Sequence, residues 1–187
     1  HTEEKMDLVK GIKERRSIRK FQDKPIDRKL IEEIVETARF APSWKNTQIV
    51  RYLVVDDKEK IAAIANSKCT YGFDYNIKAI AGAPAVVILT FVEGRSGFDK
   101  DGSFSTPKGE GWQMFDAGIA AQTFCLAAHE KGLGTVIQGY FDDAELKKVL
   151  PIPEGQQVGA VIPIGYPTEA EVAAPPRKEA SELLTFI

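Results

Sequence analysis

The segment at residues 115–131 constrains the fold more than any other part of the chain. It reads FDAGIAAQTFCLAAHEK, a helix-forming run whose many small residues let neighbouring elements pack closely against more than one face. Gly132 and Gly134 follow it and end the helix. We therefore expect a long helix that is buried by the elements around it.

Four segments read as strands. Residues 49–55 and 85–91 are rich in β-branched residues and are flanked by polar or chain-breaking residues. The second of these is nearly all apolar, which predicts a central strand. A short strand is expected near residues 135–138, after the small-residue helix, and another at residues 158–164.

Apolar residues at helical spacing predict two amphipathic helices at the start of the chain. Val9 and Ile12 mark the first, and residues 30–38 repeat the pattern after Asp27, a favourable N-cap. A later helix is expected after Asp142, because a glutamate three positions further on suits a capping box and a proline ends the segment.

The length and hydrophobic content indicate one compact domain. With 187 residues, of which 43% are hydrophobic, the chain can bury a sizeable core, and we assign residues 1–187 to a single domain. His1 is interpreted as the remnant of an expression tag. The longest irregular stretch, residues 93–111, is rich in Gly, Ser and Asp and reads as a mobile loop or a lid.

The charge balance and the apolar runs argue against two classes of partner. Twenty-five Lys and Arg against 27 Asp and Glu give a net charge of -2, which does not suit nonspecific binding to nucleic acid. The longest apolar run, residues 83–92, is too short to span a bilayer, and no signal-peptide pattern opens the sequence. We expect a cytoplasmic protein that binds neither nucleic acid nor membrane.

Metal sites and side-chain nucleophiles are poorly supported. Cys69 and Cys125 form neither a CxxC pair nor a zinc cluster, so we interpret both as buried packing residues. His129 lies in the last turn of the small-residue helix, where an imidazolium would favour the helix dipole. No nucleophile motif accompanies it. If the chain is an enzyme, a cofactor carries the chemistry and no side chain is assigned a catalytic role.

A basic run at residues 13–20, KERRSIRK, stands out in a chain that is acidic overall. Arginine offers a rigid fork of donors to phosphate oxygens and Ser17 adds a hydroxyl, each charge-assisted bond contributing roughly 1.5–3 kcal/mol when partly desolvated. The run would suit a phosphorylated cofactor. The alternative is that residues 15–20 are the solvated end of the first helix. Neither a GxGxxG turn nor a GxxxxGK[ST] loop occurs, so another phosphate-binding arrangement is required.

Four motifs follow one another along the chain: RRSIRKF at residues 15–21, APSWKNTQ at 41–48, DAGIAAQ at 116–122, and GYP at 165–167 followed by PRK at 176–178. Their order and spacing closely resemble the FMN-dependent nitroreductase family. The resemblance covers almost the whole chain, from about residue 8 to residue 178.

This resemblance implies a nitroreductase-like α+β fold, with a central mixed or antiparallel sheet flanked by helices, that forms an intertwined homodimer. Two FMN sites would lie at the subunit interface. An obligate dimer also suits the small-residue helix, since close helix packing can build a large apolar interface.

The family's cofactor-binding positions transfer residue by residue. The positions implied for the phosphate and ribityl chain are Arg15, Arg16, Ser17, Arg177 and Lys178. Arg19 would approach the pyrimidine edge of the flavin. The positions implied for the partner subunit's contribution are Pro42, Ser43, Asn46 and Gln48. The side-chain amides of the Asn and the Gln suit the hydroxyl and carbonyl groups of the cofactor.

Two further pairs of residues are implied near the flavin ring. Asn76 and Lys78 stand where the family often has a polar residue and a lysine, and a cation such as Lys78 or Arg19 would stabilise the negative charge that reduction places near N1 and O2. The alternative is that Lys78 is an exposed lysine at a helix end. Gln138 and Gly139 replace the family's acid–glycine pair, so backbone N–H groups remain to contact N5 and O4 without a carboxylate.

The implied activity is a ping-pong cycle. NADH or NADPH passes a hydride to flavin N5 and leaves, and a small electron-poor acceptor, such as a nitroaromatic or a quinone, takes its place. Three alternatives stay open. The first is the same scaffold with other redox chemistry (flavin reduction, enone reduction or dehalogenation), and the second is a flavin-binding protein without turnover. A phosphate-binding module without flavin is a third.

Overall fold

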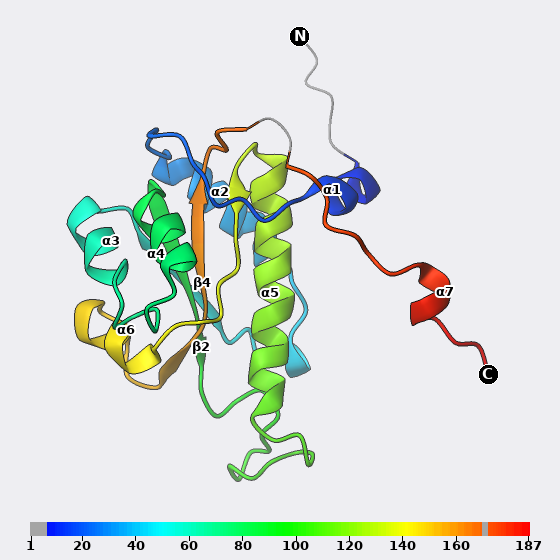
Figure 1. Cartoon of the computed structure of the whole chain (residues 1–187). Helices are drawn as coiled ribbons and strands as arrows, with labels where there is room; N and C mark the ends of the chain where they lie inside the picture. The colour runs from blue at the N-terminus through cyan, green and yellow to red at the C-terminus, as the bar shows by residue number, and fades with distance from the viewer. Residues whose placement is uncertain (1–6, 170–171) are drawn as a thin grey trace.

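The computed structural model describes residues 7–169 and 172–187, so His1 lies outside the described residues. The elements in chain order are α1 (Leu8–Glu14), α2 (Arg28–Ala38), a short 3₁₀ helix η1 (Trp44–Asn46), β1 (Val50–Val55), α3 (Lys58–Ile64), α4 (Asp74–Ala81), β2 (Ala85–Val92), α5 (Gly111–Glu130), β3 (Gly134–Thr135), α6 (Asp143–Val149), β4 (Gln156–Gly165) and α7 (Ala180–Leu183). Figure 1 shows their arrangement.

The sheet has the strand order β1-β2-β4-β3, and neighbouring strands pair antiparallel. Of the two sheet types that the sequence left open, the antiparallel one is correct. β2 lies between β1 and β4, which confirms the prediction that this apolar strand is central. The strand expected near residues 135–138 is shorter than predicted, because pairing continues beyond β3 only through the single bridge between Gln138 and Val161.

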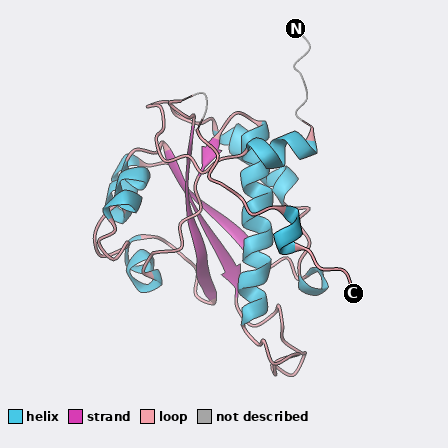
Figure 2. Ribbon diagram, turned by 45° about the vertical axis from the view of Figure 1, so that its right-hand side comes forward, coloured by secondary structure: helices cyan, strands magenta, loops and turns pink. Residues whose placement is uncertain are grey.

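Helices cover both faces of this sheet (Figures 1 and 2). Side chains alternate along a strand, so Val87 and Leu89 of β2 join the core under α2 and α5, whereas Val86 and Ile88 join the core under α3, α4 and α6. Burial on both faces explains why β2 is apolar at nearly every position.

The helix α5 begins four residues earlier than predicted and is buried on one side only. Ala117, Ala121 and Phe124 pack into the core against the sheet and α2, whereas Met114 and Phe115 are more than half exposed. Gly118 faces open space, since a Cβ added there would meet no atom within 4 Å. The prediction of a helix buried on more than one face is therefore wrong for the single chain, because the sheet and α2 bury one face of α5 and the opposite face stays exposed.

Both cysteines are free and buried, as predicted. Burial raises the pKa of the Cys125 thiol and of the Cys69 thiol. The apolar residues of α1 differ from expectation: Val9 and Ile12 are about half exposed or more, so this helix does not bury its apolar stripe within the described chain.

The predicted N-caps are present. The Asp27 carboxylate accepts a hydrogen bond from the Lys29 N–H at 2.9 Å, and the Asp142 carboxylate accepts one from the Glu145 N–H at 3.1 Å. Only half of the capping box predicted at α6 forms, because the Glu145 carboxylate instead accepts from Lys148 Nζ at 2.8 Å. The sequence did not predict α3, α4 or α7.

Residues 93–110 form an irregular loop beyond the N-terminal end of α5 (Figure 1). It carries internal bonds: the Ser105 N–H donates to the Gly97 carbonyl at 2.8 Å, and the rings of Phe98 and Phe104 lie 5.2 Å apart. The absence of regular helix or strand agrees with the sequence, and a role as a lid stays a prediction.

After β4, residues 172–187 run along the outside of the molecule and are exposed throughout. Among the described residues, no helix is both long enough and apolar enough to cross a bilayer.

Candidate functional site

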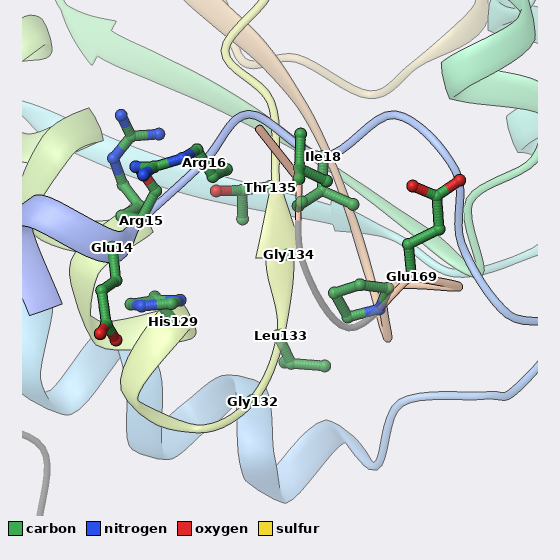
Figure 3. Close-up of a pocket in the computed structure, with 12 residues that line it drawn as sticks. Glu14, Arg15, Arg16, Ile18, His129, Gly132, Leu133, Gly134, Thr135 and Glu169 are labelled. Carbon is green, nitrogen blue, oxygen red and sulfur yellow. The ribbon is translucent and has the colours of Figure 1, made fainter. Parts of the chain in front are cut away.

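A cavity of about 540 Å³ lies where α1 ends and α5 ends (Figure 3). Its lining residues are Glu14, Arg15, Arg16, Ile18, His129, Gly132, Leu133, Gly134, Thr135, Pro167, Glu169 and Val172. The volume falls within the range of small-molecule sites, roughly 300–1,000 Å³. The cavity thus brings the first two arginines of the basic run to a pocket of ligand size.

The two arginines of this cavity have unused donors. α1 stops at Glu14, and Arg16 Nη1 donates to the carbonyls of Lys13 and Arg15 at 2.7 and 2.8 Å. The Nε atoms of Arg15 and Arg16 are buried and have no acceptor among the described residues. A buried donor without an acceptor is costly, so these atoms fit an anionic ligand such as a phosphate ester.

The basic run is not simply a solvated helix end. Residues 15–18 are partly buried, and the Ile18 N–H donates to the Thr135 carbonyl at 2.9 Å, which ties the run to β3. The alternative interpretation therefore fails for residues 15–18 and describes only Arg19 and Lys20, which are exposed.

His129 lines the same cavity from the last turn of α5. Burial lowers its pKa; Glu14 acts in the opposite direction, and Arg15 and Arg16 lower the pKa further. The sequence-based interpretation of an imidazolium at the helix end is thus opposed by the surroundings, which favour the neutral ring.

Ser17 and Arg19 line a second, smaller cavity of about 180 Å³. It shares Ile18 and Pro167 with the first cavity, so the two form adjoining parts of one groove. The Arg19 guanidinium lies 5.1 Å from the centre of the Tyr75 ring, a cation–π contact.

Asn76 and Gln138 lie in contact with each other, and their implied place near the flavin stays a prediction. Both are buried, and Gln138 Nε2 donates to the Asn76 carbonyl at 3.5 Å. One implied contact is wrong: the Gln138 backbone N–H already donates to the Val161 carbonyl at 2.8 Å and is not free for a flavin. Gly139 is exposed, and its N–H has no partner among the described residues.

Lys78 lies in the last turn of α4 and is largely exposed. Its Nζ is 2.9 Å from the Asp74 carboxylate, and this hydrogen bond and ion pair raise the pKa of Lys78. The position matches the alternative interpretation of an exposed lysine at a helix end, and a contact with the flavin stays a prediction.

The residues implied for the partner subunit lie elsewhere. Pro42, Ser43 and Gln48 line a third cavity, of about 150 Å³, together with Asp116 and Ala120 of α5. Asn46, exposed in η1, belongs to the same segment. Within one chain, these residues share no cavity with Arg15.

Arg177 and Lys178 are on the exposed segment after β4. Arg177 Nη1 donates to the Pro175 carbonyl at 3.0 Å, and neither residue lines the cavity beside Arg15. Their implied role in holding phosphate stays a prediction.

A model of the nitroreductase family matches residues 12–70 and 73–166, most of the chain. The chain belongs to the nitroreductase family. This confirms the family inferred from the motifs and places the chain among oxidoreductases.

Relatives agree with this assignment. A Methanothermobacter thermautotrophicus protein named as an NADH dehydrogenase/NAD(P)H nitroreductase is 33% identical over 169 residues, which cover 88% of this chain and 80% of the relative. An FMN reductase [NAD(P)H] of Bacillus subtilis is 27% identical over 192 residues, covering 97% of this chain and 75% of the relative.

Solved structures confirm the nitroreductase-like α+β fold. A Desulfovibrio desulfuricans protein described as a nitroreductase, crystallised in complex with FMN, superposes with a TM-score of 0.73 at 26% identity, covering 96% of this chain and 95% of that one. A nitroreductase-family protein of Streptococcus pneumoniae superposes with a TM-score of 0.82 at 23% identity, covering 97% of this chain and all of that one.

Sequence reasoning missed two features of this nitroreductase-family chain. The first is a buried hydrogen-bonded group formed by Thr47, Ser96 and Asp116; the DAGIAAQ motif included Asp116, but no role followed from it. The second is an exposed cluster of aromatic rings from Tyr71, Phe73, Tyr75 and Tyr140, whose neighbouring centroids lie 5.1 to 6.1 Å apart. Nothing in the sequence predicted that the four rings gather.

Metal ligation has no support in the described part of this chain. Among residues 7–169 and 172–187, no group of three or more His, Cys, Asp and Glu side chains is placed to hold a metal ion.

Proposed function

We propose that this nitroreductase-family protein is an FMN-dependent oxidoreductase that uses NADH or NADPH to reduce small electron-poor acceptors such as nitroaromatics or quinones. The observation that carries the proposal is the cavity beside Arg15 and Arg16, whose buried Nε donors lack a protein acceptor. The names of the relatives and the FMN complex of a similar structure support the same cofactor.

A bound FMN would supply the redox chemistry, namely hydride exchange with NADH or NADPH and reduction of the acceptor. The chain's own residues bind and orient the cofactor. Arg15 and Arg16 hold the phosphate, and Ser17 and Arg19 follow along the adjoining groove. Arg19 is a cation that can stabilise negative charge developing on the ring, and Gly139 offers its free N–H.

The homodimer is part of the proposal because the two groups of implied residues are far apart in one chain. The cavity of Pro42 and Gln48 adjoins Asp116 and Ala120 of α5, whereas the arginine cavity adjoins His129. A helix rises 1.5 Å per residue, so these parts of α5 are about 14–20 Å apart. A partner subunit that brings its own residues 42–48 to the arginine groove would complete each site.

The outer face of α5 supplies a surface for that partner. Met114, Phe115 and Gly118 are exposed on it, and Gln122 lies one turn further along. The glycine leaves room for a second helix to approach closely, and the large apolar side chains beside it would be buried by that contact. An apolar exposed face of this kind indicates an interaction surface.

The aromatic cluster suits a flat acceptor. Tyr75 borders the Ser17–Arg19 cavity, and Tyr71, Phe73 and Tyr140 extend the surface outward from it. Exposed rings offer stacking area to an electron-poor ring and interact through their faces and edges.

Flavin reduction is the second candidate, because a relative that covers nearly the whole chain is named as an FMN reductase. Rates measured with a panel of acceptors at a fixed concentration of NADH or NADPH distinguish the two functions. A nitroaromatic or quinone as best acceptor supports the first function, and free flavin supports the second.

The proposal is tested by a visible absorption spectrum of the purified protein before and after anaerobic NADH, repeated with NADPH. Flavin bands that bleach support a reducible bound FMN. Bands that persist with both reductants indicate flavin binding without turnover, and protein that takes up no added FMN would contradict the proposal.

A further inference from the structure

We propose that Asp116 is a positioning residue for the segment of residues 43–48, and that it acts on the partner subunit's FMN through that segment. The inference rests on the proposed function, since it assumes that residues 43–48 complete the FMN site of the other subunit. Nothing in the motif comparison assigned a role to Asp116.

Asp116 is 3% exposed and its carboxylate lies at the centre of a hydrogen-bonded group. The Trp44 N–H donates to its two oxygens at 3.1 and 3.2 Å. The hydroxyl of Ser96, a fully buried residue of the 93–110 loop, donates to it at 2.6 Å. Because the Ser96 hydroxyl has one proton, the Thr47 hydroxyl must donate to Ser96 Oγ across their 2.7 Å contact. Asp116 therefore fixes Trp44 directly and Thr47 through Ser96.

The segment between these contacts needs to be held. Lys45, Asn46 and Gln48 have φ angles of 46°, 53° and 52°, in the left-handed region that non-glycine residues rarely adopt. Such a backbone persists where the surrounding structure fixes it. Trp44 and Thr47 flank Lys45 and Asn46, so the Asp116 group holds the strained turn from both sides.

The other hydrogen bonds of the segment lie within it or come from Arg51 of β1, whose Nη1 donates to the Gln48 carbonyl at 2.7 Å. The Gln48 N–H donates to Ser43 Oγ at 3.0 Å, and the Asn46 N–H donates to the Ser43 carbonyl at 3.0 Å. The hydrogen bonds through Asp116 are the ones that join this turn to α5.

Asparagine at position 116 is the sharpest probe, because it keeps the shape and loses acceptor capacity. An amide nitrogen donates where a carboxylate oxygen accepted, so it would face another donor in either orientation: the Trp44 N–H, 3.2 Å from Oδ1, or the Ser96 hydroxyl, 2.6 Å from Oδ2. Two buried donors that face each other cannot form a hydrogen bond, which drives the turn to rearrange.

The first experiment measures FMN affinity by fluorescence titration and the melting temperature of the FMN-free protein. We expect Asp116→Asn to weaken FMN binding by at least about tenfold, and Ser96→Ala to weaken it in the same direction by less. Ser105→Ala is the matched control, since its hydroxyl bonds only Asp99 within the exposed part of the same loop, and it should leave affinity unchanged.

The outcomes separate the two levels of inference. Wild-type protein that does not bind FMN contradicts the proposed function. Wild-type protein that binds FMN, with Asp116→Asn and Ser96→Ala binding equally well, overturns the positioning role. A lowered melting temperature with unchanged FMN affinity also overturns it, because Asp116 would then serve stability alone.

Mixed dimers test whether the effect crosses the interface. One subunit carries Asp116→Asn, the other carries Arg15→Ala, and the mixed dimer is purified through two different tags. This dimer should contain one defective site and one site made of an intact Arg15 and an intact 43–48 segment. We expect one FMN per dimer at wild-type affinity, whereas each mutant homodimer binds weakly. A mixed dimer as weak as the homodimers would mean that Asp116 acts within its own subunit's site, and would overturn the proposal.

Discussion

Arg15 and Arg16 are neighbours in one motif, yet their side chains are engaged differently. Arg16 donates to two carbonyls at the end of α1, whereas no hydrogen bond of the Arg15 side chain is formed with the described residues. The arginine that stabilises the fold least is therefore the one with most donors to offer a phosphate.

Arg15→Ala should weaken FMN binding by roughly tenfold or more, because one charge-assisted phosphate contact contributes roughly 1.5–3 kcal/mol. The melting temperature of the FMN-free protein should not change. Arg16→Ala is the comparison, since it also removes the two bonds to α1 and should lower that temperature. Equal FMN affinity in Arg15→Ala and wild type would show that the phosphate lies elsewhere.

His129 gives the protein a pH dependence of stability. Burial lowers its pKa below the ordinary value of 6.5, so the unfolded chain binds a proton at this residue more readily than the folded chain. The stability that the neutral His129 ring gives the folded protein is complete above pH 6.5. It declines as the pH falls below 6.5 toward the lower pKa of the folded state.

Urea unfolding of the FMN-free protein at pH 7.5 and 5.5 measures this effect. His129→Gln should make the free energy of unfolding less dependent on pH across that interval than it is in the wild type. The same loss of stability in both proteins would assign the dependence to other groups.

At the scale of elements, β3 holds the basic run in place through a close contact. A Cβ added at Gly134 would lie 2.7 Å from the Cβ and Cγ1 atoms of Ile18, closer than real atoms approach. Ile18 also donates its N–H to Thr135. The glycine therefore lets the chain that carries Arg15 and Ser17 lie against the sheet.

Gly134→Ala should destabilise the protein by about 1–3 kcal/mol through overpacking and should weaken FMN binding as the run shifts. Gly111→Ala is the control, because a Cβ there meets no atom within 4 Å and Gly111 lines none of the three cavities. Urea unfolding and FMN titration of both variants make the test. If Gly134→Ala is as stable as the control and binds FMN equally well, the contact between Gly134 and Ile18 does not position the basic run.

Elements with long apolar patterns could be predicted from the sequence, and short ones could not. α2 follows a clear N-cap at Asp27 and repeats apolar residues over three turns, and β2 is a long apolar run. α3 has seven residues, of which Ile61 and Ile64 are the two large apolar ones that it buries, so its periodicity is too short to recognise. Its N-cap Asp57 was a usable signal that was missed.

The site residues, too, could be predicted where they form a contiguous motif and not where distant segments meet. Arg15 and Ser17 belong to a contiguous motif, so their role could be inferred from the resemblance. Ser96 and Asp116 meet Thr47 only because the 93–110 loop folds back against α5. Asparagine adopts left-handed φ angles more readily than most residues, but those of Lys45 and Gln48 follow from no residue preference. Contacts fixed by tertiary structure leave no local pattern to read.

At the scale of the whole molecule, the exposed face of α5 decides whether the two halves of the site can meet. Gly118→Glu should convert the proposed dimer to a monomer, because a charged side chain would be buried between the helices without a partner. Since the position faces open space in one chain, the subunit itself should stay folded. Size-exclusion chromatography with light scattering and circular dichroism report the two properties.

Ala62→Glu adds the same charge at an exposed position of α3 and should leave the oligomeric state unchanged. FMN binding should be lost in the Gly118→Glu monomer and kept in the Ala62→Glu protein. A Gly118→Glu protein that remains dimeric and retains FMN would remove α5 as the interface.

The burial of Cys69 and Cys125 has a practical consequence for measuring such a dimer. They are the two cysteines of the sequence, and burial raises both thiol pKa values, so neither presents a reactive thiolate at neutral pH. Maleimide and spin-label reagents should leave the native chain unmodified. A cysteine introduced at the exposed Ala62 of α3 would then be the one labelled position on each subunit, and the distance between two such labels could be followed without first removing a native residue.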